Sequence, residues 1–179
     1  MSDADATHLR VVPPEGAVSF LVAGQPVPQP RARVTVRGSF AHAYVPSRHP
    51  IHVWRAMVEA ACRGCSSGCL AGPVAVCVEL RVERPKGHWT TRGTLSAAGR
   101  RAGEPPGDWD NYAKAIQDAI VDTRVIGDDR QVVGPNAIVK RWAEPHEAPG
   151  AVVWIAPARE VWCTWGRLEA DRVALAESA

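Results

Sequence analysis

The amino-acid sequence predicts an α+β fold in which a small mixed β-sheet is packed by two main helices. Its clearest strand is Val74–Val82, where branched apolar residues alternate with other residues along the whole segment. Two further segments, 48–63 and 111–123, carry apolar residues at the three- and four-residue spacing of an amphipathic helix. These patterns do not follow the regular strand–helix–strand repeat of a parallel sheet, so the predicted class is α+β.

The N-terminal half is expected to contribute short strands around the first helix. Residues 1–16 are polar and acidic and predict a disordered tail. Val18–Val22 is rich in branched and aromatic residues and predicts a strand, and Ala41–Val45 predicts another. Between them, Gly24–Val34 is rich in proline with interspersed arginines, which indicates an extended loop. The helix 48–63 then follows.

The C-terminal half is expected to contain a long loop, a helix and two strands. Residues 85–107 are basic, with Pro and Gly at both ends, and a loop of this length is usually functional or mobile. The helix 111–123 follows it. Strands are predicted at Val132–Val139 and Val152–Ile155, and a terminal helix at Val161–Ala176. The domain is expected to span residues 17–157, followed by a C-terminal helical extension at 158–179.

Composition favours one globular domain in the cytoplasm. Of the 179 residues, 46% are hydrophobic, which is enough for a core without disulfides or a structural metal. No apolar run reaches the roughly 18 residues that span a bilayer, and the N-terminus lacks the apolar segment of a secretion signal. The five cysteines are therefore expected to be free thiols. Cys62, Cys65 and Cys69 have a zinc-like spacing, but no second ligand pair follows, so a Gly/Ser/Cys loop is the preferred interpretation.

Charge is distributed unevenly along the chain, although the net charge is only +2. The segment from Arg31 to Arg63 holds six arginines and a single acid, Glu59. The segment from Arg81 to Gly107 is also basic. A GC-rich coding sequence would favour Arg over Lys, but it would not separate the charges along the chain. Two basic segments together with an acidic site suggest a polyanionic substrate held on one face.

The acidic segment begins at the predicted helix 111–123. Asp108 and Asp110 are two positions apart, and such residues share a face only where the backbone is extended. We therefore expect Asp108 in the incoming loop and Asp110 at or near the N-cap. The positive end of the helix dipole would keep both carboxylates ionised.

The acidic pattern continues through this helix and beyond it. Lys114 and Asp118 follow Asp110 at four-residue intervals along one helical stripe. Gly127-Asp128-Asp129 is expected to open the next strand, after a turn that can bring Asp129 back beside the helix. Dense carboxylates repel unless a cation neutralises them, and Mg²⁺ prefers oxygen ligands of this kind. Such an ion would polarise a phosphodiester and activate water, and the absence of His from this stretch argues against zinc.

Each of these pieces also has a purely structural interpretation. Two aspartates at a helix start are common as caps, and Lys114–Asp118 is an ordinary i,i+4 pair. Asp128-Asp129 after a glycine suits a plain turn. The residues alone leave both interpretations open.

The combined spacing resembles a known family. Asp108-x-Asp110-Asn111-x2-Lys114-x3-Asp118-Ala119, followed by Asp128-Asp129-x-Gln131-Val132, is similar to the RusA family of Holliday junction resolvases, the crossover junction endodeoxyribonucleases. The N-terminal Gly24-x-Pro26-x-Pro28, the triplet Arg84-Pro85-Lys86, and Lys140 after the second motif are also family-like. Tyr112 stands where the family pattern usually has Leu, and the loop 85–107 is longer than in the shortest members. The resemblance spans roughly residues 18–156.

The resemblance implies a small homodimer that binds four-way DNA junctions and cuts two opposed strands with Mg²⁺, for which Mn²⁺ is a possible substitute. Matched residue by residue, Asp108, Asp110 and Asp129 correspond to the family's metal-binding aspartates and Lys114 to its catalytic lysine. Asp128 is a possible additional acid, and we expect Asp118 to be structural. No nucleotide cofactor or membrane is implied, and the origin would be bacterial or phage.

Several further residues have predicted roles. Candidate phosphate contacts in the basic segments are Arg31, Arg33, Arg84, Lys86, Arg92, Arg100 and Arg101. Trp89 is a candidate for stacking at a junction, whereas Trp109 is expected to pack under the site and Trp54 and Trp154 in the core. His49 and His52 are interpreted as a capping or solvated pair.

The sequence thus favours a Mg²⁺-dependent, junction-selective endonuclease acting in DNA recombination and repair. One rival is a related nuclease of flaps, forks or replication intermediates. The other is a junction-binding protein that cleaves poorly, which the intact Asp108, Asp110, Asp129 and Lys114 disfavour.

Overall fold

The structure is a computed structural model that describes residues 17–37, 39–65, 68–134 and 138–158. Its centre is a four-stranded sheet in the order β1-β6-β4-β5. The strands are β1 (Val18–Ala23), β4 (Val74–Val82), β5 (Ile138–Trp142) and β6 (Gly150–Pro157). β6 pairs antiparallel with both β1 and β4, whereas β4 and β5 run parallel. The sheet is therefore mixed, and the predicted α+β class is confirmed.

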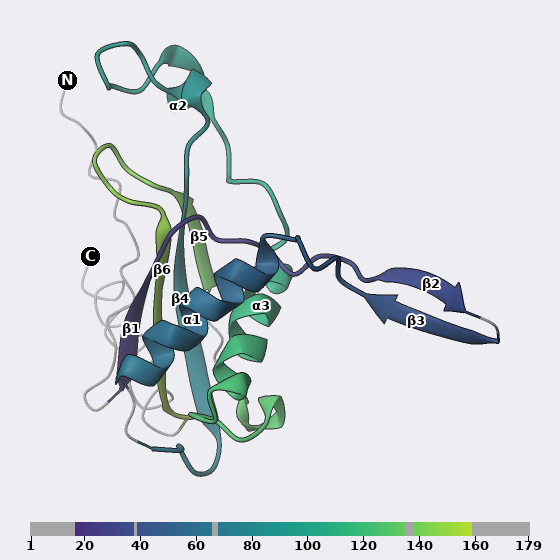
Figure 1. Ribbon diagram of the computed structural model, residues 1–179. Coiled ribbons are helices and arrows are strands. Elements are labelled where there is room, and N and C mark those ends of the chain that lie inside the picture. The colour runs from purple at the N-terminus through teal and green to yellow at the C-terminus, as the bar shows by residue number, and fades with distance from the viewer. Residues whose placement is uncertain (1–16, 38, 66–67, 135–137, 159–179) are drawn as a thin grey trace, which may run out of the picture.

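Two long helices cover one face of this sheet (Figure 1). They are α1 (Ile51–Cys65) and α3 (Trp109–Asp122). β4 directs its branched residues at this layer, which is why its sequence alternates. Trp54 of α1 and Ile116 of α3 are both buried in the resulting core. Trp154 is also buried, as predicted, but it belongs to a separate small cluster with Ala75 and Cys77.

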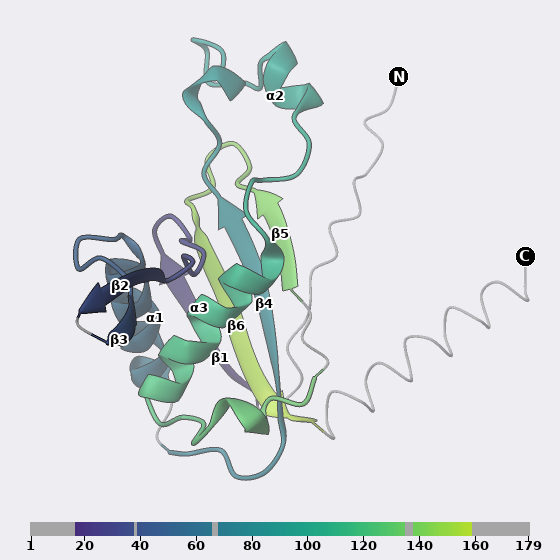
Figure 2. The ribbon, with the colours of Figure 1, turned by 90° about the vertical axis from the view of Figure 1, so that its right-hand side faces the viewer.

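Two segments project from the sheet-and-helix body (Figures 1 and 2). The first is a two-stranded ribbon formed by β2 (Arg33–Arg37) and β3 (Phe40–Tyr44). The second, beyond one end of the sheet, contains the short helices η1 (Lys86–His88) and α2 (Ala97–Arg101). We call residues 85–107 the arm. The sequence predicted the arm as a loop and did not foresee its helices.

Other expectations are corrected by the structure. β2 takes in the last two residues of the predicted loop Gly24–Val34. The strand predicted at Val132–Val139 begins only at Ile138, and Val132 forms an isolated bridge with Val74. The run is interrupted in sequence by Gly134-Pro135, and proline has no N–H for a ladder. The predicted tail 1–16 and helix Val161–Ala176 lie outside the described residues.

Among the described residues, none of the helices is long and apolar enough to cross a membrane.

Candidate active site

Asp108 occupies the N-cap position of α3 with an extended backbone, φ −76° and ψ 135°. The extended backbone was predicted, but the cap position itself was expected at or near Asp110, which lies two residues further on. Its carboxylate makes no capping hydrogen bond to the helix backbone. Its neighbour is the Asn111 amide, whose Nδ2 lies 3.5 Å from Oδ2 of Asp108. Asp110 lies in the first turn and is exposed. The capping interpretation therefore does not account for Asp108, and both carboxylates are accessible at the positive end of the helix.

The turn that precedes Asp108 is held by contacts with Tyr112 of α3 and Lys140 of β5. Gly107 has φ +88°, and a Cβ there would lie 2.9 Å from the ring of Tyr112. The Tyr112 hydroxyl donates to the carbonyl of Pro106 at 3.3 Å. From β5, Lys140 Nζ donates to the carbonyl of Pro105 at 2.6 Å and also to the carbonyl of Gly107. The position of Asp108 thus depends on β5 and on the buried ring of Tyr112.

A stripe of charged residues continues along α3 from Asp110. Lys114 Nζ lies 3.3 Å from Asp118 Oδ1, as the four-residue spacing predicted. Arg55 of α1 approaches Asp118 at 3.7 Å and Asp122 at 2.8 Å. Asp118 therefore has two cationic partners, which agrees with the structural role expected for it. No pattern in the sequence pointed to Arg55, because the pairing depends on how α1 packs on α3.

The second acidic segment forms a capped turn rather than the start of a strand. Asp128 caps η2 (Asp129–Gln131) in a capping box with Gln131. Asp128 also forms two 2.9 Å contacts with the Arg130 guanidinium, and these hydrogen bonds hold the pKa of the Asp128 carboxyl well below its usual range. Gln131 fastens the turn, since its Nε2 donates to the carbonyls of Leu70 and Gly72. Asp129 is left exposed beside this arrangement.

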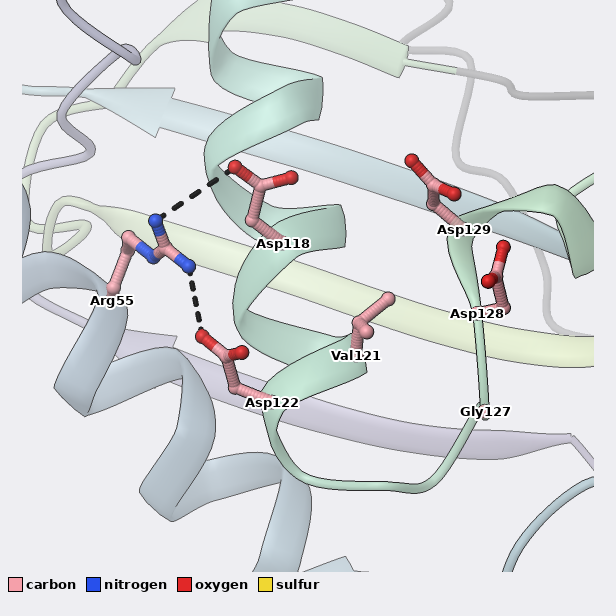
Figure 3. A pocket seen from close by; sticks show the side chains of 7 residues that line it. All are labelled: Arg55, Asp118, Val121, Asp122, Gly127, Asp128 and Asp129. Carbon is pink, nitrogen blue, oxygen red and sulfur yellow. Dashed lines mark hydrogen bonds and ion pairs between the residues drawn. The ribbon is translucent and has the colours of Figure 1, made fainter. Parts of the chain in front are cut away.

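An open pocket of about 300 Å³ lies between the C-terminal half of α3 and this turn. Its lining consists of Arg55, Asp118, Val121, Asp122, Gly127, Asp128 and Asp129. In Figure 3 the Asp118 and Asp129 side chains extend from the two sides of this space, one from α3 and one from the turn. The expectation that a turn returns Asp129 to the side of the helix is met.

The three predicted metal-binding aspartates lie in two places. Asp108 and Asp110 lie at the start of α3, whereas Asp129 lies beside its C-terminal half. At 1.5 Å per residue, Asp110 and Asp118 are about 12 Å apart along the helix axis. Within the part of the chain that the structure describes, no three His, Cys, Asp or Glu residues are grouped closely enough to hold a metal ion. The donor chemistry, however, is all carboxylate oxygen, which fits Mg²⁺.

The predicted phosphate contacts separate into two groups. Arg84 is occupied internally: it donates to the carbonyls of Ala143 and Gly99, both at 3.2 Å, and lies 5.7 Å over the Trp142 ring. Arg100 donates to the carbonyl of Leu95 at 2.6 Å, although it remains exposed. The remaining five are exposed, and no side-chain partner from the described residues accompanies them: Arg31, Arg33, Lys86, Arg92 and Arg101.

The other singled-out residues take mostly structural places. His49 Nδ1 accepts from the backbone N–H of Ile51 at 3.2 Å, and His52 Nε2 lies 3.1 Å from the carbonyl of Pro46, as expected of a capping pair. Cys62 is buried, whereas Cys65 and Cys69 are exposed thiols.

The prediction for Trp109 was wrong. Trp109 is 58% exposed instead of packing under the site. Trp109 is the first residue of α3, and Tyr112, one turn later, fills the buried position beside Gly107. The exposed Trp109 side chain therefore presents a large aromatic surface between Asp108 and Asp110.

These features define a class of protein: an α+β domain with exposed carboxylates along one helix and projecting segments that carry free arginines, as expected of an enzyme that acts on a polyanion. The comparison with protein families specifies that class. The model of the family described as Endodeoxyribonuclease RusA matches residues 23–155. The matched range includes both acidic segments and most of the chain, so the protein belongs to the RusA endodeoxyribonuclease family. A search of curated proteins gives no match.

Proposed function

We propose that the protein is a Mg²⁺-dependent, structure-selective endonuclease that resolves Holliday junctions by paired symmetric nicks. Family membership supplies the reaction class, DNA cleavage within a strand. The observation that carries the proposal is Asp108: its carboxylate sits at a helix N-cap but makes no cap to the helix backbone, and Asp110 is exposed beside it. A structural cap would use the Asp108 side chain internally.

The proposed metal-binding residues lie in two places, Asp108 and Asp110 at the start of α3 and Asp129 beside its C-terminal half, with Asp128 as a possible additional acid. When bound, Mg²⁺ supplies Lewis-acid polarisation of the phosphodiester and a water of lowered pKa. The Lys114 ammonium, 60% exposed on the stripe between Asp110 and Asp118, is proposed to offset negative charge that develops on the scissile phosphate. The Asp128–Arg130 contacts orient the turn that carries Asp129.

DNA is proposed to contact the exposed cationic side chains of the two projecting segments. Arg31 and Arg33 lie at the ribbon, and Lys86, Arg92 and Arg101 lie on the arm. A homodimer suits the proposed reaction, because a two-fold axis relates the two strands cut in a four-way junction. The proposed setting is the cytoplasm of a bacterium, with either the bacterium or a phage as the source of the gene.

The test is cleavage of matched DNA substrates by the purified full-length chain. A mobile four-way junction, a fork, a flap and a linear duplex are incubated with Mg²⁺, Mn²⁺ or EDTA. We expect paired nicks at symmetric positions of the junction, with Mg²⁺ or Mn²⁺ but not with EDTA. If flaps or forks are cut in preference to the junction, the proposed function changes to a nuclease of those structures. Tight junction binding without cutting would indicate the non-cleaving alternative.

A further inference from the structure

The β2–β3 ribbon is exposed on both of its faces. It is a separate two-stranded sheet, and every β3 residue is exposed. Val36 is 69% exposed and Phe40 is 71% exposed, so neither side packs on the body of the protein. An isolated two-stranded hairpin is marginally stable in water. A ribbon built this way is therefore expected to gain order from something that it binds.

The register of the ribbon separates its side chains by chemistry. Residues directly opposite on two antiparallel strands point to the same face. The pairs Arg33–Tyr44 and Thr35–His42 therefore share one face with Phe40, by the alternation along β3. We call Arg33, Thr35, Phe40, His42 and Tyr44 the cationic–aromatic face.

The opposite face of the ribbon has only small apolar side chains. The pairs Val34–Ala43 and Val36–Ala41 make up this apolar face. Stable interfaces between protein chains bury roughly 800 Å² on each partner. Two valines and two alanines supply only a fraction of that area, so the apolar face by itself does not account for a dimer.

The segment around the ribbon is also cationic throughout. No acidic residue occurs between Glu15 and Glu59, whereas Arg31, Arg33 and Arg48 all fall in that interval. An exposed guanidinium with no carboxylate nearby in the sequence is suited to a phosphate. Exposed aromatic rings next to it are suited to unstacked bases, because every base presents a π-face. This combination favours nucleic acid over an acidic protein surface.

The base of the ribbon lies next to the candidate active site. The backbone N–H of Gln29 donates to the carbonyl of Asn111 at 2.9 Å, which fastens the chain to the first turn of α3. Arg33 is four residues beyond Gln29, so it lies within about 14 Å of that anchor along the chain. DNA whose scissile phosphate is at Asp108 and Asp110 would therefore extend past the ribbon.

We propose that the cationic–aromatic face of the ribbon is a DNA-binding surface that holds the substrate beside the cleavage site. Arg33 pairs with a backbone phosphate, and Tyr44 and Phe40 contact bases that are unstacked where the DNA branches. This inference rests on the proposed function, since it takes DNA as the substrate. The inference adds to the proposed site a DNA-binding surface with aromatic residues, which the pattern of aspartates in the sequence does not indicate.

The experiment compares the two faces of the same ribbon. The triple variant R33A/F40A/Y44A removes the three proposed DNA contacts of the cationic–aromatic face, and V34T/V36T alters only the apolar face at similar volume. Binding of a fluorescent four-way junction is measured by anisotropy in EDTA, so that cleavage does not contribute. We expect Kd for the junction to be about tenfold or more higher in the triple variant. The slope of log Kd against log salt concentration should also become shallower, by about one unit for each phosphate that is no longer neutralised. The apolar-face variant should bind like the wild type.

Several outcomes would overturn the proposal. The first is a Kd for the junction that is unchanged in the triple variant. The second is loss of DNA binding, or a smaller oligomer, in V34T/V36T. This second result would identify the apolar face as the docking surface for another copy of the chain. If the triple variant unfolds, as judged by circular dichroism, the charge reversal Arg33→Glu provides the same test at one exposed position. Because binding is measured without metal, a wild-type protein that binds junctions but cuts none would refute only the proposed activity.

Discussion

At the scale of single residues, the structure separates aspartates that the sequence presents as one acidic stretch. Asp118 has two cationic partners, Lys114 and Arg55, and Asp128 is held by Arg130. Asp110 and Asp129 have no comparable partner within the part of the chain described, and both are exposed. The carboxylates available to a metal are therefore those without an ion pair.

The first prediction concerns Asp110. Asp110→Asn keeps the size of the side chain but removes its charge, so the cleavage rate should fall by on the order of 100-fold or more while junction binding persists. Asp122→Asn is the matched control, because Asp122 also lies on α3 but pairs with Arg55 at 2.8 Å. Rates are measured on the four-way junction, and equal losses in both variants would contradict the assignment of Asp110 to the metal.

The second prediction concerns Lys140, which we regard as a positioning residue. Lys140→Met removes the hydrogen bonds to the carbonyls of Pro105 and Gly107, so the turn that carries Asp108 should loosen. Loss of such an indirect support typically costs about tenfold in metal affinity or activity. We expect the Mg²⁺ concentration for half-maximal cleavage to rise, with DNA affinity unchanged in EDTA. A fall in cleavage with an unchanged Mg²⁺ requirement would argue against positioning.

At the scale of elements, the arm projects from the body but is held by contacts with β5 and by a cap within the arm. Trp142 of β5 donates from Nε1 to the carbonyl of Gly103 at 2.5 Å, and its ring lies edge-on to His88 with centroids 5.3 Å apart. Ser96 caps α2 by accepting from the Gly99 N–H. The arm is thus a folded unit attached through β5, and its exposed cations have defined positions.

The third prediction tests this order in the arm. A Cβ at Gly99 would lie 2.3 Å from the carbonyl oxygen of His88, so Gly99→Ala should force η1 and α2 apart. Gly103→Ala is the control, because a Cβ there meets nothing within 4 Å. Hydrogen exchange in residues 86–101 should accelerate in the first variant only. Equal exchange in the two variants would show that the arm is not packed as described.

Element boundaries show what the sequence could and could not reveal. β4, β6 and α3 were predicted because each carries branched apolar residues in a run or at a regular spacing, so the signal is local in the sequence. β2 was not predicted, because it forms a strand only by pairing with β3, in a ribbon that has no core. Within the site, spacing identified the aspartates. Lys140 was recognised only as family-like, and the role of Arg55 was missed, since each acts on a segment distant in sequence.

At the scale of the whole molecule, an ion-pair network joins the sheet to the turn before β6. Arg141 of β5 contacts Glu79 of β4 at 2.6 Å and Glu147 at 2.6 Å. Arg81 adds a contact to Glu147 at 3.3 Å. Hydrogen bonding to Arg141 is the main cause that lowers the pKa of Glu147 to about 2 from its usual 4.5. The network is partly buried and links three separate parts of the fold.

The fourth prediction follows from this depressed pKa. A carboxyl whose pKa is lowered on folding stabilises the protein above its unfolded pKa and loses that effect as the pH falls toward the folded value. Glu147→Gln should therefore lower the free energy of unfolding by roughly 2 kcal/mol at pH 7. The difference from wild type should shrink between pH 4.5 and 2. Urea unfolding at pH 7 and pH 3 tests this, and a difference independent of pH would contradict it.

The parallel pairing of β4 with β5 has a consequence for when the support for Asp108 forms during folding. Val78 of β4 lies opposite Ile138 of β5, and the arm, α3 and the turn bearing Asp129 all belong to the chain between them. Pairings across such a sequence separation form slowly, because the intervening loop must close first. Lys140, which fixes the entry to Asp108, is itself on β5. A growing chain therefore lacks this support for the entry to Asp108 until β5, with Lys140, has been synthesised.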